Sequence, residues 1–104
     1  MRIRYLPKAL AFIENLDPTL GARANKTLDL LMDRGHTLRM PFSKSVEDGF
    51  FELRVIGAVH IRLLYFFHQG EAVVVHAFLK QTPQLNRKDI DYAQRARSSF
   101  IAGT

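Results

Sequence analysis

Five basic side chains interrupt the most apolar part of the sequence. They are Arg54, His60, Arg62, His76 and Lys80. Burying a charge without a partner is costly, so a cation within an apolar strand needs either an acidic neighbour or a task. Guanidinium and ammonium groups stabilise the charge that builds up on a phosphate in a transition state, and imidazole moves protons near neutral pH. These residue types therefore suit chemistry on a phosphate ester.

Three apolar runs of strand length carry these basic residues, and turn signals at residues 56–58 and 68–70 separate the runs. Side chains alternate between the two faces of a strand, and all five basic residues are even-numbered. They share one face if both connections contain an odd number of residues, for example residues 57–59 and 68–70. A connection of two residues would put the neighbouring strands out of phase.

Three-residue connections predict which side chains meet across the strands. Arg54 lies opposite Arg62, and Arg62 lies opposite His76. Like charges directly opposite each other are destabilising unless an anion lies between them. A phosphate would supply that anion, and Glu52, which has the same parity, is the alternative partner. The other face is expected to pack on helices through Phe51, Leu53, Val55, Ile61, Leu63, Tyr65, Val73, Val75 and Leu79.

The histidines and the remaining basic residues each have two interpretations. His76, and after it His60, are candidates for general acid–base catalysis, although lone histidines in strands more often have structural roles. No carboxylate or third imidazole joins them at the spacing of metal ligands, so no metal site is expected. Lys44, Arg87 and Lys88 are expected either to position phosphates or to be solvated surface charges.

Helices that precede and follow the strands in the sequence must hold this face in place. An apolar stripe with the helical period predicts a helix over residues 7–16. Asp17, followed by Pro18, predicts the start of a second helix, which ends near Gly35 in the left-handed conformation. A last helix begins after the cap residue Asn86, with Asp89 placed as in a capping box.

The complete order of elements is β-α-α-β-β-β-α. Residues 1–5 suit a short edge strand with Ile3 pointing inward, and residues 36–49 form a connector. This order predicts an α+β domain in which helices pack on one face of a largely antiparallel sheet. At 104 residues, the chain is expected to form a single domain, residues 1–104.

Composition narrows the class of protein and of partner. The net charge is +5 with an isoelectric point near 10.0, which indicates an anionic partner, either a nucleic acid or an acidic protein segment. No apolar run is long enough for a membrane span, and the start of the chain lacks a signal-peptide pattern. With no cysteines, disulfides and thiolate metal sites are excluded. The expected compartment is the cytoplasm.

Several short motifs, taken in order, resemble one known family. Residues 38–41, 44–46 and 49–54 are similar to L-x-x-P…K-x-L…G-L-Y-E-L-R, residues 61–67 to Y-R-[VIL]-L-Y-F-F, and residues 76–82 to H-G-F-x-K-K-T. In this order the motifs resemble those of the phage-derived subgroup of the RelE/HigB-like toxins. The resemblance covers most of residues 38–98.

This resemblance implies both a fold and an activity. The fold is a RelE-like, mostly antiparallel sheet with a helical hairpin on one face and a C-terminal helix. The activity is that of a toxin from a bacterial toxin–antitoxin pair, a metal-independent and cofactor-free endonuclease that cuts mRNA on the ribosome. The expected partner is an antitoxin with a helix-turn-helix domain, similar to HigA.

The resemblance also assigns roles to residues. Arg62 matches the strand arginine associated with RNA cleavage, Lys80 matches the basic position that closes the last strand, and Arg54 matches the signature arginine. The expected catalytic set is Arg62, Lys80, His76 and Arg54. The expected RNA-binding set is Lys44, His60, Arg87 and Lys88. Two alternatives remain open: a gyrase-targeting toxin resembling the ParE branch, and a non-catalytic module that only binds an antitoxin.

Overall fold

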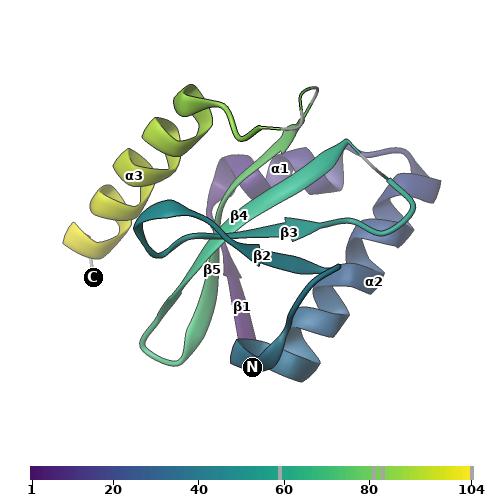
Figure 1. Cartoon of the computed structure of the whole chain (residues 1–104), viewed down its shortest axis with the longest axis horizontal. Coiled ribbons are helices and arrows are strands. Elements are labelled where there is room, and N and C mark those ends of the chain that lie inside the picture. Colours follow the sequence, from purple (N-terminus) through teal and green to yellow (C-terminus); the bar gives the residue numbers. More distant parts are fainter. Residues whose placement is uncertain (59, 81, 83, 104) are drawn as a thin grey trace.

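A computed structural model gives the fold, and it describes residues 1–58, 60–80, 82 and 84–103. Helices flank a twisted sheet, with α2 and α3 at opposite ends of it (Figure 1). The elements are β1 (Arg2–Tyr5), α1 (Pro7–Glu14), α2 (Pro18–Arg34), the 3₁₀ turn η1 (Gly35–Thr37), β2 (Ser43–Ser45), the 3₁₀ turn η2 (Glu47–Gly49), β3 (Phe51–Arg54), β4 (Ile61–His68), β5 (Glu71–Leu79) and α3 (Arg87–Ala102).

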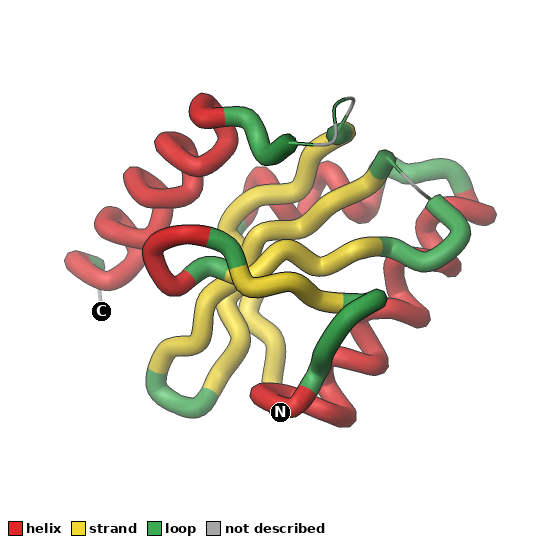
Figure 2. Tube along the Cα trace, in the orientation of Figure 1, coloured by secondary structure: helices red, strands yellow, loops and turns green. Residues whose placement is uncertain are grey.

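The sheet has five strands in the order β1-β5-β4-β3-β2 (Figure 2). The edge strand β1 pairs in parallel with β5, and the other pairs are antiparallel. The predicted mixed α+β class with a mostly antiparallel sheet is confirmed. The expected order was incomplete, because the connector at residues 36–49 contains β2. Its three residues, Ser-Lys-Ser, are too few and too polar to show the alternation that identifies a strand.

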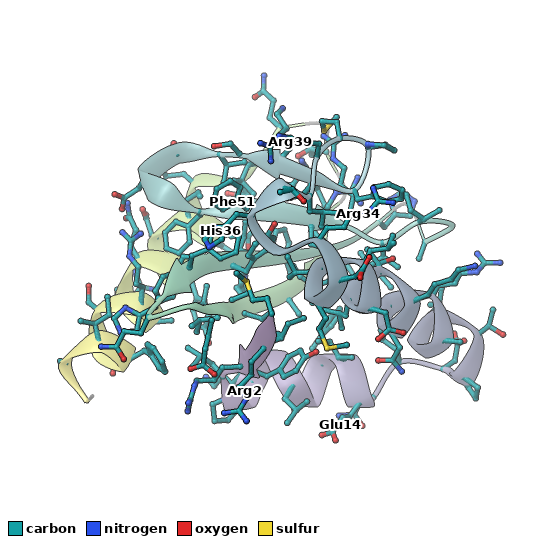
Figure 3. All side chains as sticks on the ribbon, turned by 90° about the horizontal axis from the view of Figure 1, so that it is seen from below. Arg2, Glu14, Arg34, His36, Arg39 and Phe51 are labelled. Atoms are coloured by element: carbon teal, nitrogen blue, oxygen red, sulfur yellow. The ribbon has the colours of Figure 1, made fainter. Side chains whose placement is uncertain are left out.

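Apolar cores cover both faces of the sheet, so the expectation that all the helices pack on one face was wrong. One core joins the sheet to α1 and α2 and includes Ala9, Ile13, Leu28, Leu31, Leu53, Leu63 and Val74. The other joins it to α3 and includes Phe50, Leu64, Phe66, Val73, Val75, Phe78, Ile90 and Ala93. Figure 3 shows α1, which carries Glu14, below the sheet. The even-numbered face that carries the basic residues is therefore the α3 side.

The hairpin between β4 and β5 differs from the expected three-residue connection. His68 pairs with Glu71, so Gln69 and Gly70 alone form the turn. Both have positive φ angles, 50° and 78°, as a type I′ turn requires. That turn is one residue shorter than expected. The connection from β3 to β4, by contrast, spans residues 55–60 and is longer than expected, and Val59 lies outside the described residues.

A β-bulge in β5 restores the phase that this two-residue turn removes. Leu64 pairs with His76, but the next residue, Tyr65, pairs with Val74, which leaves Val75 as the extra residue. Val73 and Val75 consequently pack on the α3 side, rather than against α1 and α2 as expected. Leu79, also expected in that core, is 56% exposed.

The helix ends show how the sequence sets the limits of α1 and α2. Pro7 is the first residue of α1, and the Asp17 carboxylate accepts a hydrogen bond of 3.0 Å from the backbone N–H of Leu20 at the start of α2. Gly35 ends α2 with φ 52° and ψ −126°. The positive φ was expected, but this ψ lies outside the left-handed helical region.

Candidate functional site

Glu52 lies at the centre of a group of basic side chains on the α3 side of the sheet. Its side chain is 1% exposed. The ammonium of Lys80 donates to Oε2 at 3.0 Å, and Nε of Arg54 lies 3.5 Å from Oε1. Nε of Arg62 lies 3.6 Å from the same oxygen. We call Glu52, Arg54, Arg62 and Lys80 the Glu52 cluster. One carboxylate faces three cations there, which leaves two positive charges in excess.

Strand register brings the members of this cluster together. Arg54 lies directly opposite Arg62, as predicted from parity. Arg62 lies opposite Phe78, so its expected pairing with His76 was wrong. The two-residue turn and the bulge each shift the register by one residue, and together they place His76 opposite Leu64 instead.

Arg62 is the least compensated of the three cations. Burial lowers the pKa of its guanidinium below the usual value, Glu52 opposes that change, and the neighbouring Arg54 adds to it. Its Nη1 donates to the carbonyl of Ile61 at 3.0 Å, but its Nε is buried without a hydrogen bond. A buried cation that lacks part of its hydrogen bonding favours the arrival of an anion. Its side chain is 16% exposed, so the cluster is not sealed from solvent.

His76 belongs to a second arrangement beside the cluster. Its Nε2 lies 2.8 Å from Oδ1 of Asp89, near the start of α3. Its ring stacks on Phe78 at 4.6 Å between centroids and contacts Tyr92 at 4.5 Å. We call His76 and Asp89 the imidazole–carboxylate pair. It connects the sheet to α3.

Lys80 joins the two arrangements through a cavity of about 460 Å³. The lining residues come from β5, the segment that follows it and the start of α3: His76, Phe78, Leu79, Lys80, Thr82, Gln84, Asn86, Lys88 and Asp89. A cavity of this size holds a small organic group. It presents an imidazole and two ammonium groups, which is the equipment for binding an anion and moving a proton.

The remaining predicted residues lie around this site and differ in their exposure and in their contacts. His60 is exposed, with its Nδ1 3.2 Å from the Lys80 carbonyl oxygen, which ties the start of β4 to the end of β5. Lys44 is exposed on β2 directly opposite Glu52. Lys88 lines the cavity. Arg87 forms ion pairs with Glu47 at 2.6 Å and with Asp91 at 3.0 Å, so acids already neutralise it.

Sequence reasoning missed the acidic and aromatic side chains that α3 contributes to the site, Asp89 and Tyr92. Asp89 was interpreted as part of a capping box, but the Asn86 side chain alone caps the helix, through the Lys88 N–H at 3.2 Å, and Asp89 binds His76. Tyr92, whose ring contacts His76, was not among the expected site residues. The available signal was the spacing: residues 89 and 92 are three apart and so lie on one side of a helix.

Metal and membrane features were searched over the described residues only. There, no group of three or more His, Asp or Glu side chains is arranged to hold a metal ion. No helix within the same residues is long and apolar enough to cross a membrane.

The sequence of residues 11–98 matches the family described as "Phage derived protein Gp49-like (DUF891)". The chain belongs to this family. The match spans most of the sheet, α2 and the greater part of α3, so it includes both the Glu52 cluster and the imidazole–carboxylate pair. The predicted resemblance to the phage-derived subgroup of RelE/HigB-like toxins is thereby confirmed.

Solved structures resemble the fold at low sequence identity. The isolated E. coli RelE toxin aligns with a TM-score of 0.61 and 11% identity, over 90% of this chain and 96% of that one. A chain of the YoeB–YefM complex from Staphylococcus aureus gives 0.58 and 13%, over 74% and 93%. The S. aureus YoeB dimer gives 0.57 and 16%, over 79% and 97%. The fold of this Gp49-like protein is therefore RelE-like. No curated protein sequence matches the chain.

Proposed function

We propose that this Gp49-like protein is the toxin of a bacterial toxin–antitoxin pair and cleaves RNA. The observation that carries the proposal is the Glu52 cluster, in which two positive charges in excess lie on a partly open face beside a histidine. An RNA phosphate supplies the missing negative charge. The RelE-like fold and the names of the similar structures, RelE toxin and YoeB, support the same class of protein.

The proposed reaction is attack of a ribose 2′-OH on the adjacent phosphate. The new bond joins the 2′-oxygen to phosphorus, the bond to the 5′-oxygen breaks, and the products are a cyclic phosphate and a 5′-OH end. Arg62, helped by Arg54, stabilises the extra charge on the phosphorane. His76 takes the proton of the 2′-OH, and the Lys80 ammonium gives one to the leaving 5′-oxygen before it is protonated again from water.

RNA beyond the reacting phosphate is held by the outer basic residues. Lys44 and His60 extend the positive surface from the exposed ends of the cluster, and Lys88 extends it across the cavity. Arg87 contributes less, because Glu47 and Asp91 already neutralise it. Besides mRNA, the proposed partners are the ribosome and a helix-turn-helix antitoxin similar to HigA. The proposed compartment is the cytoplasm. The net charge of +5 favours an acidic segment of that antitoxin.

The deciding experiment maps mRNA ends after induction of the chain without an antitoxin. Wild-type chain is expected to arrest growth and to produce new 5′-OH ends. The double variant Arg62→Ala with Lys80→Ala is expected to lose both effects. Undiminished cleavage by this variant would show that the site assignment is wrong. Growth arrest with intact mRNA and a DNA-damage response would instead indicate a gyrase-targeting toxin. No growth arrest would indicate a module that only binds its antitoxin.

A further inference from the structure

We infer that Asp89 is a positioning residue that fixes the tautomer of His76, so that Nδ1 of His76 is the atom that accepts the 2′-OH proton. The inference rests on the proposed function, because it refines the proton transfer in that reaction. It assigns a task to α3, from which sequence reasoning expected no functional side chain other than the basic Arg87 and Lys88.

The geometry of the ring supports this role. Nε2 of His76 and Oδ1 of Asp89 are 2.8 Å apart, and a carboxylate can only accept. In a neutral imidazole the proton must therefore be on Nε2, and Nδ1 carries the lone pair. Among the described residues Nδ1 has no partner, and it is not one of the atoms sealed from solvent without a hydrogen bond.

The surroundings of the ring limit its movement. Phe78 stacks on it at 4.6 Å with an angle of 20° between planes, and Tyr92 lies 4.5 Å away at 41°. A general base acts only within hydrogen-bond distance of the proton that it accepts. A ring held in one orientation lowers the entropic cost of reaching that geometry. The ring and Asp89 both line the cavity that Lys80 and Lys88 share. The orienting contact therefore lies in the same cavity as Lys80 and Lys88, two of the residues proposed to contact the RNA.

Anchoring α3 to the sheet is the competing explanation for this contact. However, α3 has separate anchors: Ile90 and Ala93 are buried against the sheet, and Arg97 binds both the carbonyl and the carboxylate of Asp48. The guanidinium of Arg97 also lies 4.2 Å above the Phe50 ring. These contacts hold the helix without Asp89. The hydrogen bond between Asp89 and the partly buried His76 is therefore not needed for anchoring, and a role in orienting the imidazole explains it.

The proton balance follows from the tautomer. The 2′-OH proton moves to Nδ1 while the oxygen attacks phosphorus, which gives an imidazolium whose two N–H groups face the new cyclic phosphate and Asp89. The charge of Asp89 stabilises that imidazolium. The imidazolium returns its proton to water after the product leaves, and no oxidant, reductant or metal takes part.

The test is a double-mutant cycle on the rate of mRNA cleavage after induction. Asp89→Asn keeps the shape but allows the amide NH₂ to donate, so the opposite tautomer becomes available. We expect Asp89→Asn and His76→Gln each to lower the rate about tenfold to a hundredfold. The variant with both changes is expected to be no slower than His76→Gln alone, because Asp89 acts only through His76. Asp89→Glu, which keeps a carboxylate, is expected to recover part of the rate.

A matched control and a spectroscopic readout separate chemistry from folding. Asp91→Asn removes the same charge from the same helix, at a half-buried position that contacts Arg87 instead of His76, and is expected to change the rate less than about twofold. Chain labelled with ¹⁵N by cell-free synthesis is expected to show His76 protonated on Nε2, and Asp89→Asn to show a mixture of tautomers. The labelled variants also report whether each chain is folded.

The outcomes distinguish this inference from the proposed function. If Arg62→Ala with Lys80→Ala abolishes cleavage while folded Asp89→Asn cleaves at the wild-type rate, the inference is wrong and the proposed function stands. Additive losses in the double-mutant cycle would also overturn it, since they would indicate a structural contribution from Asp89. If no variant changes mRNA cleavage, the proposed site itself fails.

Discussion

The Glu52 cluster and the imidazole–carboxylate pair lie side by side, but they hold charge in opposite ways. In the cluster one buried carboxylate lies close to three cations, two of them on strands and the third, Lys80, directly after β5. In the pair one carboxylate contacts one imidazole, and this contact connects the sheet to a helix. The cluster is short of negative charge, whereas the pair joins one carboxylate to one imidazole through a single hydrogen bond. Under the proposed function, the cluster attracts the anionic substrate and the pair controls the geometry of proton transfer.

The largest effect is expected from removing the carboxylate at the centre of the cluster. Glu52→Gln leaves Arg62 and Lys80 poorly solvated with no negative partner, so the free energy of unfolding should fall by about 3–5 kcal/mol. Urea denaturation measures this change. The matched control is Glu71→Gln, whose partners Arg2 and Arg4 are well exposed, with an expected loss below about 1 kcal/mol. Equal losses for the two variants would show that Glu52 contributes no more to stability than the carboxylate of an exposed ion pair.

Removing the least compensated cation should separate stability from activity. Arg62→Met keeps the length of the side chain but removes a desolvated charge, so the free energy of unfolding should stay within about 1 kcal/mol or rise. Cleavage of mRNA should fall about a hundredfold or more, because the phosphorane loses its main stabilising contact. The control Arg54→Met, at a more exposed arginine, should lose less activity. A parallel fall in stability and cleavage would mean that Arg62 is structural.

The pair should respond differently, through geometry rather than charge. Tyr92→Leu keeps an apolar side chain on α3 but removes the aromatic contact with His76, so cleavage should fall severalfold. Stability should fall by about 1 kcal/mol, the contribution typical of such ring contacts. The control is Tyr5→Leu, a tyrosine on β1 outside the α3-side core, which should lower stability without changing cleavage per folded molecule. Unchanged cleavage in Tyr92→Leu would remove the ring contact from the mechanism.

The smallest effect is expected at the outer edge of the cluster. Lys44 faces Glu52 across the strands but is exposed, with no ion pair among the described residues. Lys44→Gln should weaken RNA binding only slightly and lower the salt dependence of binding by about one phosphate contact. Fluorescence anisotropy with a single-stranded RNA at several salt concentrations measures both. Lys26→Gln, on α2, should leave the salt dependence unchanged, and equal effects would show that the charge acts without regard to place.

The sequence could predict the cluster better than the pair. Parity along β3 and β4 placed Arg54 opposite Arg62, because each strand is regular there. It failed in β5, because three consecutive valines, residues 73–75, are apolar on both faces and fit every register. The two-residue turn and the bulge each shift the register by one residue. Neither shift can be detected from a run of residues that are all apolar.

Long-range contacts account for the rest of what the sequence did not reveal. Asp89 obeys a local capping pattern, so nothing near it in the chain points to His76, thirteen residues earlier. The side of the sheet that α3 covers also depends on where the chain goes after β5 rather than on the helix itself. The strand β2 forms only because β3 offers a free edge to three polar residues.

The bulge at Val75 links two lengths of chain that would otherwise vary independently. If Glu71 joined the turn, so that the pairing of β5 slipped by one residue while the bulge stayed, His76 would move to the side of α1 and α2, away from Arg54 and Arg62. Losing the bulge alone would have the same result. His76 stays on the face of Arg54 and Arg62 when both register shifts are present or both are absent, so a slip of this hairpin that leaves only one of them would separate the imidazole from the two arginines.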